Sequence, residues 1–361
     1  MAIISSVKSF SLKISRKGRK SSSKYLDDDL PPLKPVVLPR VHPDHQIALS
    51  EQGWTTVGLD EKPTDALYDS YQDLLRASQA FFDLPDDYKQ TFKTQHGSEE
   101  GWSRVEGEKE FITLRTIQNT PGELKEAASK YWAEAGGLLN GTLGKVAESL
   151  DLPAQALTVY SEPCAMLGDE ETATMLRIFR YEGFEGKESK VVAEAHADLG
   201  LLSFVIGDKP GLEVMDHRAD FWFPIEQSYE SSKGSLLAGR QLERLSNARY
   251  RAGSHRVRSY PNPVIDSKKS PCPSENWRHS IVFVMRAHLP VSVNTDKLTS
   301  EITGPFSRPL KDITARELFD NIHSAHFNIN TGIEEREQQR KRLAEQEKYS
   351  ATGNRFIGEL E

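Results

Sequence analysis

The sequence has almost no cysteine and no long hydrophobic run. Its 361 residues include only two cysteines, Cys164 and Cys272, which lie far apart and beside prolines. A disulfide framework and a cysteine-based zinc site are therefore excluded. No apolar stretch approaches the roughly 18 residues that span a bilayer, so we expect no membrane span. The low cysteine count is typical of a reducing compartment and favours a cytoplasmic protein.

Acidic side chains outnumber basic ones outside the N-terminal segment. The net charge is −7, yet the first 25 residues hold seven Lys and Arg side chains and no acid. The rest of the chain carries 39 basic against 53 acidic side chains. A surface this acidic is a poor match for phosphates, so we expect no nucleic-acid partner. The basic, Ser-rich head is interpreted as a disordered tail, with a mitochondrial presequence as the main alternative and a short nuclear signal as a weaker one.

Changes in composition and periodicity divide the chain into three parts. Residues 1–40 are predicted to be a tail and linker, 41–330 the folded domain, and 331–361 a charged, solvated C-terminal helix or tail. Helical spacing predicts one helix over 64–83 and a second from about Glu123 to Leu150, which four glycines are expected to break in two. After residue 174 short strand-like runs replace helices, so the domain divides into a helical part, 41–165, and a β core, 166–310. This order predicts a mainly β protein with flanking helices.

Two histidines and an aspartate have the spacing of a metal site. His196 and Asp198 are two residues apart, which places both on the same side of a strand end, and His255 follows 57 residues after Asp198. Two imidazoles and a carboxylate can hold one face of Fe(II) and leave open positions for other ligands. The short motif alone is a weak signal because such spacings also occur by chance.

Other segments, in order, strengthen the interpretation. They are AHADLGLLS at 195–203, PGLEV at 210–214, FWFPI at 221–225, SHRV at 254–257 and RHS at 278–280, with FFDLP at 81–85 and Lys89, Gly101-Trp102 and Lys109-Glu110 upstream. Over roughly residues 40–310 this set resembles the Fe(II)- and 2-oxoglutarate-dependent oxygenases of the isopenicillin N synthase-like superfamily. The resemblance implies a distorted double-stranded β-helix (jelly roll) with Fe(II), 2-oxoglutarate as co-substrate and O2.

The resemblance also implies residue roles. His196, Asp198 and His255 would bind the metal, and Tyr181, Arg278 and Ser280 would hold the 2-oxoglutarate carboxylate. The guanidinium fork of arginine suits a carboxylate. Alternation along the strands adds Arg177, Phe179, Val284 and Arg286 to the predicted substrate pocket. Phe204 is also predicted to line the pocket, and Phe327 to close over it from the C-terminal end. Arg177 and Arg286 have two open interpretations: they hold an acidic substrate, or they pair with acids at the rim.

The expected activity is oxidation of a small metabolite by hydroxylation, desaturation or cyclisation, coupled to 2-oxoglutarate decarboxylation, with a role in secondary metabolism. Two alternatives stay open: an iron oxidase of the same fold that does not use 2-oxoglutarate, and a non-catalytic binding module. The chain departs from the family pattern at Arg240, where relatives usually carry Asp, at Phe179, where many carry Asn, and in a longer loop at 262–277, which is either a lid or an inert insertion. The protein is expected to be a monomer or a homodimer.

Overall fold

The computed structural model describes residues 33–45, 49–59, 65–182, 189–260, 277–324, 330 and 334–342. Contacts group the chain into two units, Met1–Lys34 and Pro35–Glu361, and the fold below is that of the second. The predicted tail up to residue 32 lies outside the described residues. So do Phe327 and the 262–277 loop apart from Trp277.

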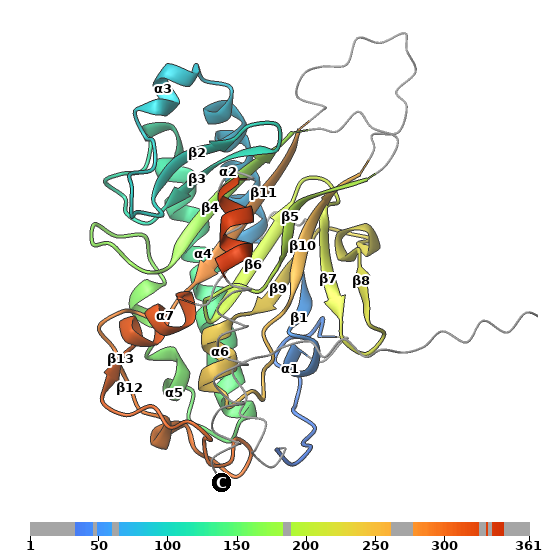
Figure 1. Cartoon of the computed structure of the whole chain (residues 1–361), viewed down its shortest axis with the longest axis vertical. Helices are drawn as coiled ribbons and strands as arrows, with labels where there is room; N and C mark the ends of the chain where they lie inside the picture. The colour runs from blue at the N-terminus through green and yellow to red at the C-terminus, as the bar shows by residue number, and fades with distance from the viewer. Residues whose placement is uncertain are drawn as a thin grey trace, which may run out of the picture. The chain divides into compact units, whose positions relative to one another are not determined.

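Most strands belong to a seven-stranded major sheet (Figure 1). In spatial order they are β1 (Trp54–Gly58), β9 (Lys233–Ala238), β6 (Leu202–Gly207), β11 (Arg278–Met285), β4 (Met175–Tyr181), β3 (Lys109–Leu114) and β2 (Gly101–Val105). All neighbouring pairs are antiparallel. The register places Ser280 of β11 opposite Phe179 of β4 on one side and Gly207 of β6 on the other.

A four-stranded minor sheet accompanies the major sheet. Its strands, side by side in Figure 1, are β5 (Lys190–His196), β10 (His255–Ser259), β7 (Leu212–Asp216) and β8 (Phe221–Phe223). A cluster of buried side chains that includes Val205, Leu237, Val192 and Val214 joins the two sheets. Two antiparallel sheets around one core make this the expected double-stranded β-helix. A small ladder, β12 (Ser292–Val293) with β13 (Ile313–Thr314), lies outside both sheets.

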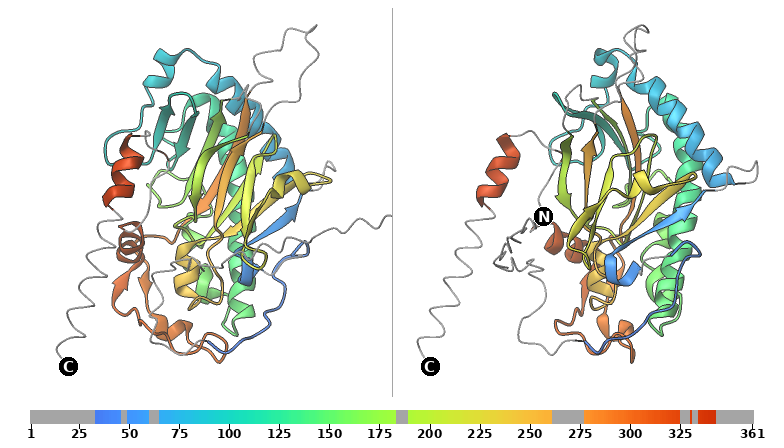
Figure 2. Two further views of the ribbon diagram at one scale, coloured as in Figure 1. Left: turned by 45° about the vertical axis from the view of Figure 1, so that its right-hand side comes forward. Right: turned by 90° about the vertical axis from the view of Figure 1, so that its right-hand side faces the viewer.

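Two long helices, α2 (Ala66–Phe82) and α4 (Gly122–Ser149), cover the other face of the major sheet (Figure 2). The remaining labelled helices are α1 (Leu49–Gln52), α3 (Asp86–Gln90), α5 (Gln155–Thr158), α6 (Arg240–Leu245) and α7 (Ala315–His323). The expectation of a break in the second helix is wrong, since α4 runs unbroken. Gly136 lets the helix approach Ala165, whose carbonyl oxygen would lie 2.4 Å from an added Cβ. Tertiary packing of the buried face therefore outweighs the low helix propensity of glycine.

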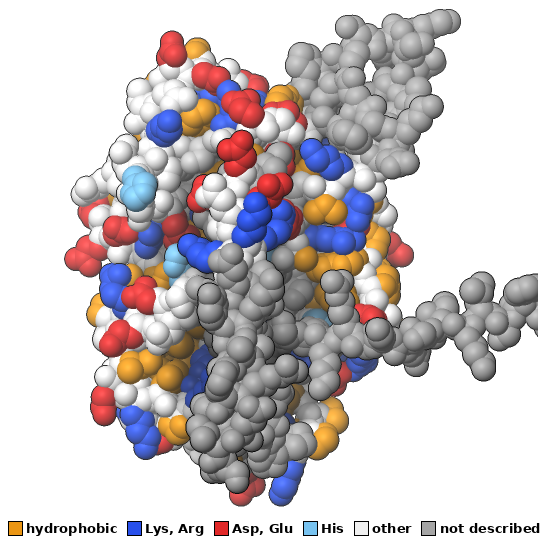
Figure 3. Space-filling view, viewed as in Figure 1, with side chains coloured by type: hydrophobic (Ala, Val, Ile, Leu, Met, Phe, Trp, Pro, Cys, Tyr) orange, Lys and Arg blue, Asp and Glu red, His pale blue; other side chains and the backbone are white. Residues whose placement is uncertain are grey.

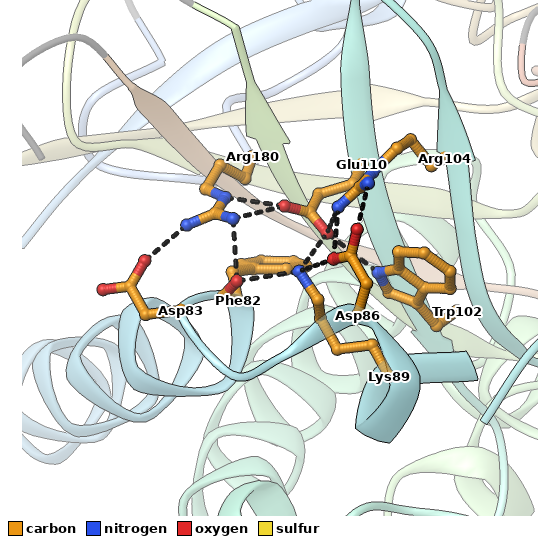
Figure 4. Close-up of polar contacts among 8 residues, drawn as sticks. All are labelled: Phe82, Asp83, Asp86, Lys89, Trp102, Arg104, Glu110 and Arg180. Carbon is orange, nitrogen blue, oxygen red and sulfur yellow. Dashed lines mark hydrogen bonds and ion pairs between the residues drawn. The ribbon is translucent and has the colours of Figure 1, made fainter. Parts of the chain in front are cut away.

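A buried polar network ties the end of α2 to strands β2–β4 (Figure 4). Glu110 of β3 accepts hydrogen bonds from Lys89 (3.0 Å), Trp102 (3.0 Å) and Arg180 of β4 (2.8 Å). Arg180 also pairs with Asp83, 2.6 Å away, just after α2. Because Arg180 adjoins Tyr181 on β4, the network fixes the strand whose opposite face carries predicted site residues.

The C-terminal helix is not wholly solvated, contrary to the sequence-based expectation. Residues 334–342 are helical, and Arg336 is buried. Its Nη2 donates to both carboxylate oxygens of Glu108, at 2.8 and 2.9 Å, and this ion pair explains why one face of the helix is covered.

On the face drawn in Figure 3, acidic and basic side chains are interspersed. Among the described residues, no helix combines the length and apolar character needed to cross a membrane.

Candidate active site

The three predicted metal ligands lie together at one end of the minor sheet. His196 is the last residue of β5 and His255 the first of β10, and the two are register partners. Asp198 follows β5 by two residues. One ligand atom from each of the three lies within 4.8 Å of the others. The cluster arises because the i, i+2 pair leaves a strand end next to the start of the neighbouring strand.

Each imidazole is oriented by the backbone. Nδ1 of His196 lies 2.8 Å from the Glu194 carbonyl oxygen, and Nδ1 of His255 lies 3.0 Å from that of Gly253. If each Nδ1 donates its proton there, each Nε2 is left as an acceptor. The two Nε2 atoms lie 3.8 and 3.9 Å from Asp198 Oδ1.

The Asp198 carboxylate also fits a bound cation. Its Oδ2 is buried and has no hydrogen-bond partner among the described residues. Burial by itself would raise the pKa of this carboxyl, but the His255 and His196 imidazoles hold the pKa below its usual value. A carboxylate with one buried oxygen that has no hydrogen-bond partner among the described residues, facing two imidazole nitrogens, is part of a donor set that suits a divalent transition metal.

Arg278 is held by a partner that the sequence did not reveal. Its Nη2 lies 2.9 Å from Oε2 of the buried Glu226, and its Nε donates to the Lys209 carbonyl oxygen at 2.8 Å. The guanidinium lies over the Tyr181 ring, 5.4 Å from its centroid. Nη1 is buried and has no partner among the described residues. One side of the fork is therefore fixed, and one donor remains for a ligand.

Two glycines make room for this guanidinium. A Cβ on Gly211 would lie 2.4 Å from Arg278 Nε, and one on Gly207 would lie 2.6 Å from Nη2. The backbone N–H groups of Gly211 and Leu212 both donate to Glu226 Oε2 at 2.7 Å. These two backbone hydrogen bonds hold the carboxylate of Glu226, which lies on the short 3₁₀ helix Ile225–Ser228, in place opposite Arg278.

A cavity of about 280 Å³ is lined by the three predicted metal ligands. It includes His196, Asp198 and His255, together with Tyr181, Ser280, Arg177, Phe179, Val284 and Arg286 from the predicted sets. Arg278 is not among the lining residues, since its fork turns toward Glu226 and the 207–211 segment.

The prediction for Phe204 is wrong. Phe204 is fully buried in the core under the helices, whereas its neighbour Val205 lines the cavity. Side chains alternate along β6, so only one of these two neighbours can face the site, and that residue is Val205 rather than the predicted Phe204.

Arg177 and Arg286 both lie close to the carboxylate of Glu99 at the cavity. Both terminal nitrogens of Arg286 donate to Glu99, one at 3.0 Å, and Arg177 Nη2 lies 3.9 Å from the same carboxylate. Glu99 and Glu226 are two site residues that the sequence patterns did not predict. Neither sits in a motif, and only the long-range pairing of each with an arginine identifies it.

Comparisons with known proteins agree with this geometry. The family model of the 2OG-Fe(II) oxygenase superfamily matches residues 173–286, which contain the triad, Tyr181, Arg278 and Ser280. The chain is 26% identical over 322 residues to the 2-oxoglutarate-dependent dioxygenase ecdK of Aspergillus rugulosus, which covers 78% of this chain and 91% of the relative.

Solved structures share the fold. One is a full-length Neurospora crassa protein in complex with alpha-KG and thymine, with a TM-score of 0.57, 15% identity, and coverage of 77% of this chain and 89% of that one. Another is the rice dioxygenase for auxin oxidation, with a TM-score of 0.55, 21% identity, and coverage of 77% and 86%. At these identities the likeness supports the architecture alone.

Proposed function

Because the chain belongs to the 2OG-Fe(II) oxygenase superfamily, we propose that His196, Asp198 and His255 hold its catalytic iron. The enzyme is an Fe(II)- and 2-oxoglutarate-dependent dioxygenase that acts on a small metabolite. The observation that carries the ligand assignment is the convergence of two backbone-oriented imidazoles on the Asp198 carboxylate, whose buried Oδ2 has no hydrogen-bond partner among the described residues. When bound, iron supplies oxygen activation coupled to the conversion of 2-oxoglutarate into succinate and carbon dioxide.

The co-substrate would be oriented by the chain's own donors. Arg278 does not line the cavity itself, but its Nη1 has no partner among the described residues, and its guanidinium lies over Tyr181, which lines the cavity together with Ser280. These groups would hold the distal carboxylate of 2-oxoglutarate by charge-assisted hydrogen bonds. Glu226 and the close backbone of Gly207 and Gly211 (the glycine cradle) keep the Arg278 guanidinium from turning. Little conformational freedom of this side chain is therefore lost when 2-oxoglutarate binds.

Substrate would bind in the remaining cavity, between Phe179, Val284 and the arginines Arg177 and Arg286. We place an anionic group of the substrate at these arginines. Positioning of the substrate relative to the metal then decides between hydroxylation, desaturation and cyclisation, because the same oxidant serves all three.

An anaerobic titration tests the site assignment. Metal-free protein is given Fe(II) and then 2-oxoglutarate, and the visible charge-transfer band of the chelate is followed. We expect a band in the parent, none in His196→Ala, and a weaker one in Arg278→Ala with unchanged iron content. Iron binding without a band would favour the oxidase alternative, in which Arg278 holds the substrate's own carboxylate. No iron binding would favour the binding-module alternative.

Succinate formation gives a second readout. Slow substrate-free turnover of 2-oxoglutarate should produce succinate in the parent and not in Asp198→Ala. The matched control is Asp169→Ala, a substitution in a connection distant in sequence from the triad, and it should keep the parent's rate.

We also propose a cytoplasmic monomer or homodimer that binds no nucleic acid. Low cysteine content and the acidic body support this proposal. A mitochondrial location is the alternative, and it rests on the basic N-terminal segment. Imaging of the full chain against a chain without residues 1–25 would separate them, because a presequence would give mitochondrial signal only in the full chain.

A further inference from the structure

Glu99 occupies the cationic end of the cavity. It lies in the connection before β2 and lines the cavity together with Arg177 and Arg286. Arg286 grips its carboxylate with both terminal nitrogens, while Arg177 and Arg115 approach to 3.9 and 4.0 Å. Burial alone would raise the pKa of Glu99, but Arg286, Arg177 and Arg115 lower it to about 2. Glu99 is therefore an anion at every physiological pH.

Glu99 is more exposed than the arginines that hold it. The side chain of Arg286 is 4% exposed, whereas that of Glu99 is 35% exposed. Arg177 donates through Nε to Thr113 Oγ1 at 2.7 Å and lies over the Phe111 ring. The carboxylate of Glu99 can therefore rotate into solvent, and the two guanidinium groups cannot follow it.

The backbone that carries Glu99 is pinned by the next residue. Glu100 Oε1 accepts hydrogen bonds from the N–H groups of Arg115 (2.9 Å) and Thr116 (2.7 Å) and from the Thr116 hydroxyl (2.9 Å). Its Oε2 accepts from Asn119 at 2.8 Å. A change of side-chain rotamer at Glu99 thus frees the arginines without moving the connection.

The arginines retain binding capacity for a ligand. Nε of Arg286 is buried and has no hydrogen-bond partner in the described part of the chain. With neutral histidines, the charged side chains among the lining residues are Arg177 and Arg286 against Glu99 and Asp198. Fe(II) and the dianion of 2-oxoglutarate cancel each other. Removal of Glu99 from the cavity would leave one positive charge, which one carboxylate would neutralise.

We propose that Glu99 is a built-in carboxylate that occupies the recognition site for the anionic group of the substrate, and that a monocarboxylate binds by displacing it from Arg286 and Arg177. The inference rests on the proposed function, because it names the substrate class of that same cavity. Glu99 gives these buried arginines an anionic partner in the absence of substrate. An anion also has to bind the two arginines more favourably than Glu99 does, so anions with low affinity for this site are excluded.

Binding of small carboxylates tests this proposal. The full chain is loaded anaerobically with Mn(II) and saturating 2-oxoglutarate, then titrated calorimetrically with phenylacetate, 3-phenylpropionate and hexanoate, each against its neutral amide. In Glu99→Gln the competing charge is gone, so at least one carboxylate should bind about tenfold tighter than to the parent, or more. The affinity for the amides should not change.

Matched variants define the outcomes. Glu171→Gln removes another acid from Arg115 but none from the cavity lining, and it should bind carboxylates like the parent. Arg286→Met in the Glu99→Gln background should abolish the gain. Equal or weaker carboxylate binding by both Glu99→Gln and Glu99→Ala, or no binding of any of the three acids to these variants, would overturn the proposal.

A second signal separates this inference from the proposed function. The charge-transfer band with Fe(II) and 2-oxoglutarate does not depend on Glu99 and should appear in the parent and in every Glu99 variant. A normal band without the gain in carboxylate affinity refutes the role of Glu99 alone. A parent without the band refutes the proposed function.

Discussion

The Gly211→Ala variant tests whether the cradle around Arg278 sets the affinity for 2-oxoglutarate. The added Cβ would lie 2.4 Å from Nε and 2.9 Å from Cζ of Arg278, where ordinary contact begins at 3.4 Å. The guanidinium must therefore move by about 1 Å, which breaks the aligned bonds to the Lys209 carbonyl and Glu226. The free Nη1 then no longer points where the co-substrate needs it.

The expected loss is that of one charge-assisted hydrogen bond, about 1.5–3 kcal/mol. This corresponds to a rise in the Kd for 2-oxoglutarate of about 10- to 150-fold. The assay is the anaerobic titration of the iron-loaded protein with 2-oxoglutarate, followed by the charge-transfer band. Iron content should equal that of the parent, because Gly211 is not one of the proposed metal ligands.

Gly137→Ala is the matched control. This glycine lies on α4, and an added Cβ would meet nothing within 4 Å. Its Kd for 2-oxoglutarate should equal that of the parent, with stability equal or up to about 1 kcal/mol higher. If Gly211→Ala binds 2-oxoglutarate as tightly as the parent while Arg278→Ala does not, the cradle does not position the fork, and the reasoning fails.

Three further predictions concern the metal, the buried network and the cavity wall. His196→Ala should retain the fold and lose iron, measured as metal content and circular dichroism; full iron content would contradict the ligand assignment. Glu110→Gln should lower the free energy of unfolding by about 1.5–3 kcal/mol at pH 7, because Lys89 and Arg180 lose the buried carboxylate that they share and keep only the more exposed Asp86 and Asp83 as acidic partners. Burial opposes ionisation of Glu110, but Arg180 and Lys89 hold its pKa below the ordinary 4.5. Its contribution is therefore complete above pH 4.5 and is lost as the pH falls through the lowered pKa, so denaturation curves of parent and variant should converge in acid, whereas a constant gap would refute the linkage. Phe204→Ala should lower the free energy of unfolding by about 3–5 kcal/mol and leave the 2-oxoglutarate band intact. Val205→Phe should fill the cavity and weaken carboxylate binding. The reverse pattern would show that Phe204, and not Val205, lines the pocket.

The elements whose pattern is local were predictable. The strand over 175–181 and the helix near 64–83 appear as β4 and α2, because alternation and 3.6-residue spacing directly encode which face is buried. The second helix was expected to break at its glycines, yet α4 is continuous. Propensity describes an isolated segment, whereas the close approach at Gly136 favours the unbroken helix only after the chain has folded.

The sequence by itself predicted the residues that we propose carry the chemistry of this protein. His196 and Asp198 are encoded by a two-residue spacing at a strand end, and the ordered motifs add His255 and the Arg278–Ser280 pair. Only the tertiary structure decided which acids face the arginines and which side of β6 faces the cavity. Glu226 and Glu99 reach Arg278 and Arg286 across 52 and 187 residues. An ion pair between distant segments leaves no periodic trace in the sequence, so its partners become known only when the folded chain brings them together.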